Sequence, residues 1–163
     1  EANLAYRWVM NMKSIDTLVS RPSSIENPEA LQEVLEVVLE AFDCVTGTVH
    51  VLDQKSQLLE LRAQQGIPAF LISKVESIPI GKGIAGAAAE QRGPVQICNL
   101  QTDTSGVARP EAKKMQVAGS LAVPMLRGTE LRGTLGIGKT EAYDFPEEEI
   151  AQLKRVADWF AQA

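Results

Sequence analysis

The chain contains one glycine-rich motif whose spacing suits phosphate chemistry. Gly81, Gly83 and Gly86 form a G-x-G-x-x-G pattern between a strand-like run and an Ala-rich helical run. In dinucleotide-binding proteins such a loop opens a longer helix, and an acidic residue follows about 20 residues later. Here Gly93-Pro94 closes the helical run early, and no repeating strand–helix units follow. We therefore interpret the motif as a structural turn, although the amides that open the helix can still hold a carboxylate or phosphate.

Few other side chains could carry out acid–base, nucleophilic or metal chemistry. The chain has one histidine, His50, and two cysteines, Cys44 and Cys98, which form no C-x-x-C pair. This set cannot readily supply the four ligands of a structural zinc site, and no Ser-His-Asp arrangement can be built from it. We expect His50 to be a buried, hydrogen-bonded strand residue, with a polar contact in a ligand pocket as the alternative. The cysteines are expected to be small, reduced packing residues. The prediction is no catalytic residue, no metal site and no enzymatic activity.

The composition indicates an ordinary globular domain. A length of 163 residues suits one domain plus an extra helix, and 45% hydrophobic residues are enough for a core. The net charge of -5 and the scattered basic residues argue against nucleic acid as a partner. No apolar run approaches the roughly 18 residues of a membrane span, and the first residues do not resemble a signal peptide. We expect a cytoplasmic location and no membrane contact.

The hydrophobic pattern predicts helices at both ends of the chain and strands between them. Residues 1–22 carry apolar side chains at heptad spacing, and Asn27-Pro28-Glu29 is a typical helix start. An acidic turn after Pro146 predicts the last helix. Strands are expected at 48–52, 58–63, 75–80, 95–98, 120–126 and 133–138, and short helices at 67–73 and 84–91. This order indicates an α+β (mixed α/β) fold. It would have a central, mostly antiparallel sheet of about six strands, the terminal helices on one face, and short helices and loops on the other.

Several short motifs, in this order, resemble the GAF domain family. They are Val49-His50-Val51-Leu52-Asp53, the run from Ile78 to Gly86, Gly93-Pro94-Val95, the run from Ser120 to Met125, and Gly133 to Gly138 with a later Phe145 to Glu149. The resemblance covers most of the chain. It implies a GAF domain over residues 27–163, including the last helix, preceded by a linker or dimerisation helix over residues 1–22.

The resemblance also sets the functional expectations, because GAF domains are small sensory modules. Free methionine sulfoxide reductases in this family carry a cysteine where this chain has Ala85, and further cysteines in the loop 99–119, which has none. The Asn-Lys pair of cyclic-nucleotide-binding members and the late-loop Cys of bilin-binding members are also absent. The resemblance therefore implies a non-enzymatic sensor, of unknown ligand and cofactor, that signals through its terminal helices to an output domain. The alternatives are a dimerisation or interaction module without a ligand, and a redox enzyme of the reductase type.

Two structural expectations follow from this interpretation. We expect a ligand to lie between the sheet and the segment 81–119, and the candidate ligand-binding residues are His50, Gly83, Ile84, Ala85, Cys98, Arg109 and Ser120. In the alternative, the loop collapses and Val107, Met115 and Val117 fill the space. We also expect a homodimer through the first and last helices, with a surface patch formed by Leu4, Trp8, Ile15, Leu18, Leu153 and Phe160.

Overall fold

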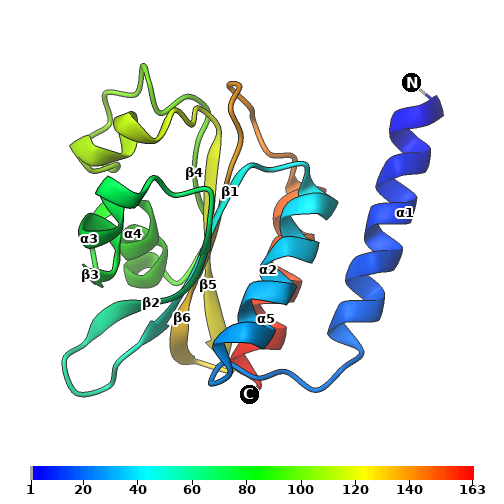
Figure 1. The fold of residues 1–163 in the computed structure, drawn as a ribbon, viewed down its shortest axis with the longest axis horizontal. Helices are drawn as coiled ribbons and strands as arrows, with labels where there is room; N and C mark the ends of the chain where they lie inside the picture. Colours follow the sequence, from blue (N-terminus) through cyan, green and yellow to red (C-terminus); the bar gives the residue numbers. More distant parts are fainter. Residues whose placement is uncertain (1) are drawn as a thin grey trace.

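The structure is a computed structural model that describes residues 2–163, and it consists of one sheet between layers of helices (Figure 1). The helices on one side of the sheet are α2 (Pro28–Phe42) and α5 (Glu147–Ala161), and α1 (Ala2–Val19) lies outside them. The other side carries the 3-10 helix η1 (Ala69–Leu71), α3 (Ile72–Val75), α4 (Gly83–Gln91) and the 3-10 helix η2 (Pro110–Met115). This arrangement confirms the α+β fold predicted from the sequence.

The sheet has six antiparallel strands in the order β3-β2-β1-β6-β5-β4. The strands are β1 (Thr46–Leu52), β2 (Leu58–Gln65), β3 (Ser77–Pro79), β4 (Val95–Ile97), β5 (Ser120–Arg127) and β6 (Glu130–Gly138). The strand predicted at 75–80 is shorter in the structure, where β3 covers only Ser77–Pro79, because residues 72–75 form the short helix α3. Strand β1 contains a register shift between Val49 and His50 where it pairs with β2.

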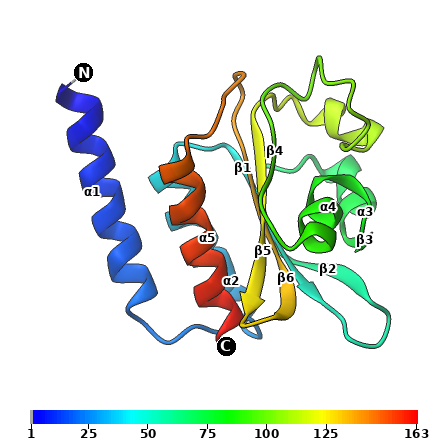
Figure 2. The same ribbon diagram turned by 180° about the vertical axis from the view of Figure 1, so that it is seen from behind.

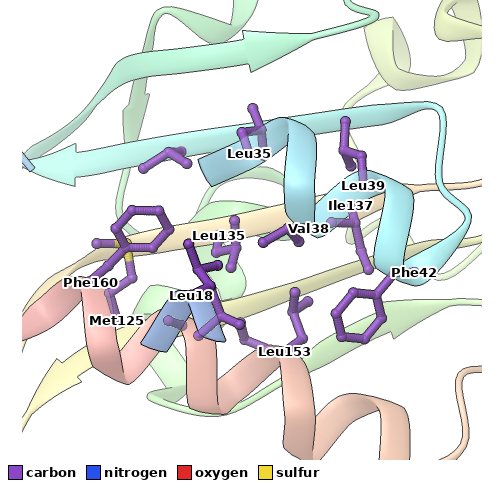
Figure 3. Packing of buried hydrophobic residues seen from close by; sticks show 14 of the residues in the cluster. Leu18, Leu35, Val38, Leu39, Phe42, Met125, Leu135, Ile137, Leu153 and Phe160 are labelled. Carbon is purple, nitrogen blue, oxygen red and sulfur yellow. The ribbon is translucent and has the colours of Figure 1, made fainter. Parts of the chain in front are cut away.

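Helices α2 and α5 cover one face of the sheet and enclose the main hydrophobic core (Figure 3). Helix α2 begins as predicted: the Asn27 side chain accepts a hydrogen bond from the amide of Glu29 at 3.0 Å, and Pro28 occupies the first turn. Its buried side chains and those of α5 meet Leu135, Ile137 and Met125 of the sheet. Each fully buried Leu or Phe contributes roughly 1.5–3 kcal/mol of transfer free energy.

Helix α1 forms a further layer outside α2 and α5 (Figure 2). Its C-terminal half is anchored by Ile15 and Leu18, which are fully buried in the main core. Polar contacts add to this, since Trp8 donates to Glu148 at 3.2 Å and Arg155 pairs with Asp16 at 2.6 Å.

These contacts correct the predicted dimer patch. The side chains of Ile15, Leu18, Leu153 and Phe160 are at most 3% exposed, because they pack on the domain's own helices and sheet. They are therefore not available to a second copy. The large apolar side chains that α1 exposes include Leu4, Tyr6, Val9 and Met10.

No helix within residues 2–163 is both long and apolar enough to cross a lipid bilayer.

Candidate functional site

A cavity of about 120 Å³ lies between the sheet and the layer formed by α3, α4 and η2. Its floor is a patch of small side chains on three neighbouring strands. Thr46 of β1 and Ser120 of β5 lie in one row across the sheet, on either side of Gly138 of β6, which Val117 covers instead of the cavity. The next row is Thr48, Gly136 and Ala122. Because successive residues of a strand point to opposite faces, both rows face the same side, and their small size leaves space under the helices.

The cover of the cavity is mainly apolar. It is built from Ile67, Leu71, Val75, Ile84, Ala85, Ala112 and Met115. Three charged residues, Lys74, Arg109 and Glu111, also border the cavity. The loop 99–119 does pack partly on itself, since Val117 is buried in a small cluster that includes Val107 and Met115. That packing fills only part of the space, so the loop covers the cavity without abolishing it.

His50 is the most polar group on the cavity floor, and it is 1% exposed. Its Nε2 lies 2.7 Å from the carbonyl oxygen of Val75. A carbonyl oxygen only accepts, so Nε2 carries the proton and Nδ1 presents a lone pair. Burial lowers the pKa of His50, against the opposing effects of the Val75 carbonyl and the Glu60 carboxylate, which keeps the ring neutral near pH 7.

Nδ1 of His50 has no hydrogen-bond partner among the described residues. On the neighbouring strand β6, Thr134 pairs with His50, and its buried hydroxyl also has no hydrogen-bond partner among the described residues. Buried polar atoms are nearly always hydrogen-bonded, because an unpaired one retains the full cost of leaving water. These two unsatisfied groups stand opposite each other on one face of the sheet, and neither atom has appreciable surface accessible from the cavity.

The glycine-rich motif shapes the end of α4 that borders this cavity. Gly81 has a φ of +90°, a conformation that favours glycine. A Cβ on Gly86 would lie 2.6 Å from the carbonyl oxygen of Pro79, so the motif allows a close approach of two backbone segments. These are structural roles. The N-terminus of α4 nevertheless points its opening residues, Gly83, Ile84 and Ala85, at the cavity.

Six of the seven residues expected to bind a ligand line the cavity, namely His50, Gly83, Ile84, Ala85, Arg109 and Ser120. Cys98 does not, because it follows the end of edge strand β4 and is exposed, whereas its neighbour Ile97 points inward. The expectation that both cysteines are packing residues is therefore wrong for Cys98. Apart from Ser120, the small floor residues were not identified from the sequence, since only the register of three strands brings them together.

Cys44 lies on the opposite side of the sheet, packed against the main core. Burial raises the pKa of its thiol to about 12, and the ammonium of Lys139 only partly offsets this effect. Neither cysteine of the chain lines the cavity, and Cys44 stays protonated at neutral pH. No thiolate is therefore positioned to attack a group held in the cavity.

The comparisons with known proteins agree with this architecture. A family model described as a GAF domain matches residues 26–163. The chain belongs to the GAF domain family. No curated protein matches it.

Solved structures with the same fold include GAF domains of larger proteins and free-standing reductases. The GAF domain is similar to that of a phosphoenolpyruvate-protein phosphotransferase from Coxiella burnetii, with a TM-score of 0.79, 24% identity, and coverage of 97% of this chain and 92% of the other. The corresponding GAF domain from Acinetobacter matches with a TM-score of 0.75, 17% identity, and coverage of 95% and 90%. Free methionine-R-sulfoxide reductase from Neisseria meningitidis, solved in complex with its substrate, matches with a TM-score of 0.73, 21% identity, and coverage of 91% and 82%. At these identities the likeness establishes only the fold, so the function has to be argued from the residues of the site.

Proposed function

We propose that this GAF domain is a non-enzymatic sensory module that binds a small molecule between the sheet and the segment 81–119. The observation that carries the proposal is the cavity itself, which combines a mainly apolar wall with a few polar and charged residues, among them Ser120, Lys74 and Arg109. Ligand pockets are typically concave, mostly apolar and supplied with a few well-placed polar groups. Binding would favour one packing of the terminal helices, and those helices would pass the change to an output domain.

The placement of the cysteines favours binding over redox catalysis. The structural neighbours include reductases, so an enzyme is the natural alternative. Cysteine-based reduction needs an activated thiolate next to the substrate. Here Cys44 is behind the sheet with its pKa raised to about 12, and Cys98 is exposed outside the cavity.

A second candidate is an interaction module, and the exposed face of α1 favours it. Tyr6, Val9 and Met10 are 64%, 52% and 42% exposed on one helix. Apolar side chains that gather on a surface are typical of a contact with another protein. The two roles are compatible, since α1 is also the helix through which a signal would leave the domain.

The cavity can be tested by filling it. Ala122→Leu adds three carbon atoms to a floor residue, whereas Ala151→Leu makes the same change on the exposed side of α5. Native mass spectrometry of protein purified from cells should show a bound small molecule on the wild type and on Ala151→Leu, and none on Ala122→Leu. Circular dichroism would verify that both variants are folded. The proposal fails if the wild type carries no molecule and no compound from a metabolite collection raises its melting temperature.

A further inference from the structure

The lining of the cavity also defines the kind of molecule that it accepts. Resting on the proposed function, we infer that the ligand is a small, uncharged and mainly apolar molecule of about the size of one aromatic ring. It lies on the small residues of the floor, under the aliphatic side chains of the cover. The site selects it by shape and by the exclusion of charge.

Among the described residues, none on the floor of the cavity carries a charge. Burial lowers the pKa of His50, so its ring is neutral near pH 7, and its unpaired Nδ1 has no appreciable surface accessible from the cavity. A charged group placed on this floor would therefore leave water without gaining a counter-charge. The residues of β1, β5 and β6 that line the cavity are Thr46, Gly47, Thr48, His50, Ser120, Leu121, Ala122, Gly136 and Ile137.

The charged residues of the cover are exposed to solvent at least in part. Lys74 is exposed, and Arg109 and Glu111 are partly exposed. The aliphatic part of Arg109 lies against the start of α4, since a Cβ on Gly83 would be 3.3 Å from its Cδ. Its guanidinium forms a hydrogen bond of 3.4 Å, in an exposed setting, to the carbonyl oxygen of Lys74. Arg109 therefore adds methylene groups to the cover and keeps its charge at the surface.

Two features of the cover attract an anion, but both act weakly. Helix α4 has nine residues and begins at the cavity, and a helix terminus changes the affinity for an ion only about two- to fivefold. Exposed cations such as Lys74 add no more than this, because water and salt screen them, and Glu111 opposes them. Removal of an unpaired carboxylate from water weakens binding by more than about a hundredfold. The balance favours an uncharged ligand.

The volume sets the size of the ligand. A cavity of about 120 Å³ is comparable to an engineered cavity of ~150 Å³, in another protein, that takes up benzene. Side chains around an unfilled space lack contacts on one side, and an apolar molecule restores those contacts. The aliphatic side chains that would contact it come from four segments of the cover, namely Ile67, Leu71, Val75, Ile84, Ala85, Ala112 and Met115.

Gly136 sets the depth of the floor. It lies on β6 between Thr48 of β1 and Ala122 of β5. A Cβ on Gly136 would be 3.0 Å from Oγ1 of Thr48 and 3.8 Å from the carbonyl oxygen of Leu121, so it would stand in the cavity and not in a packed core. The φ of Gly136 lies outside the left-handed region, so its backbone also accepts alanine. The absent side chain at this position is therefore space that the ligand can use.

The inference can be tested with probes of matched shape and different charge. Benzyl alcohol, benzoate and benzylamine share one ring and are neutral, anionic and cationic at neutral pH. The set of 1-pentanol, pentanoate and pentylamine repeats the comparison without a ring. In calorimetric titrations of the wild type, at least one of the two alcohols should bind at least about ten times tighter than both of its charged relatives. The NMR signal of the Ala122 methyl group should shift during the same titration.

Two variants assign the binding to the cavity. Gly136→Ala should weaken binding of the preferred alcohol about tenfold, because the new methyl group occupies the floor. Gly93→Ala adds the same group outside the cavity, where only the carbonyl oxygen of Gln91 lies within 4 Å at 3.9 Å, and should leave binding unchanged. Circular dichroism would verify that both variants are folded. If Gly136→Ala does not fold, the wild-type comparison of charged and neutral probes still decides the point.

The outcomes separate this inference from the proposed function. Binding of benzoate or benzylamine as tightly as benzyl alcohol, or a charged molecule bound to the wild type in native mass spectrometry, overturns the inferred ligand class while the cavity remains a binding site. Binding of an alcohol that leaves the Ala122 signal unshifted, and that Gly136→Ala does not weaken, also overturns it. Absence of every bound molecule and every probe overturns both.

Discussion

The ammonium group of Lys139 lies 2.7 Å from the carbonyl oxygen of Phe42 and donates a hydrogen bond to it. A second hydrogen bond, of 3.0 Å, reaches the carbonyl oxygen of Asp43. Lys139 follows β6 and is 5% exposed, and these two carbonyls end α2. The ammonium also lies 4.6 Å from the ring centre of Tyr143. A buried cation thus joins the end of the sheet to the negative end of a helix dipole.

Replacement of this lysine should measure the strength of that junction. Lys139→Met keeps the length of the side chain but leaves both carbonyl oxygens without their donor. We expect the free energy of unfolding to fall by about 1–3 kcal/mol, measured by urea denaturation. Lys113→Met, at an exposed position of η2, is the matched control and should change it by less than about 0.5 kcal/mol. Equal stability of the two variants would mean that the buried cation contributes nothing.

The stability of the domain should depend on pH through His50. Burial lowers the pKa of His50 in the folded state, so between that value and the unfolded value of about 6.5 only the unfolded chain binds the proton. This contribution to stability is therefore complete above pH 6.5 and is lost as the pH falls below it, by up to about 1.4 kcal/mol per pH unit. Urea denaturation between pH 5.5 and 7.5 should show a steeper decline for the wild type than for His50→Gln. Parallel curves would exclude a neutral, buried His50.

The two cysteines should differ strongly in their reactivity. Cys98 is exposed, whereas burial raises the pKa of Cys44 to about 12. Iodoacetamide at pH 8 should therefore modify Cys98 at least ten times faster than Cys44 in the folded protein, as followed by peptide mass spectrometry. Denaturant should remove most of this difference. Rapid double labelling of the native protein would show that Cys44 is accessible as a thiolate.

The homodimer expected from the sequence stays a prediction, and the structure changes the residues on which it depends. Ile15 belongs to the core, so a charge at that position tests folding and not assembly. Val9 and Met10 are exposed, and Val9→Glu with Met10→Glu should convert a dimer to a monomer in light scattering without loss of helix content. Gln54→Glu with Gln91→Glu adds the same charge at exposed positions away from α1 and should leave the mass unchanged. A wild type that is monomeric at high concentration would contradict the prediction.

The elements of the fold were predictable because their signals are local. The cap at Asn27 predicted the start of α2, and two consecutive strand-like runs, at 120–126 and 133–138, predicted a hairpin that the structure contains. The sequence did not show which surface buries the apolar face of each terminal helix. Ile15 and Phe160 lie on amphipathic helices, and such a pattern shows that a face is buried without showing whether a sheet or a second chain buries it.

The candidate site was predictable only in outline. The loop 99–119 and the end of α4 were expected to cover the free face of the sheet, and they do. The cavity depends on Thr48, Gly136 and Ala122, which come from three strands and meet only through the register of β1, β6 and β5. Register is a property of paired strands, so the volume under the loop could not be derived from any one of them.

The register shift in β1 has a mechanical consequence. Val49 packs in the core beneath α2, and the next residue along the chain, His50, forms the floor of the cavity. The peptide unit between them is common to both compartments. A displacement of this peptide unit would therefore move side chains on both faces of the sheet at once.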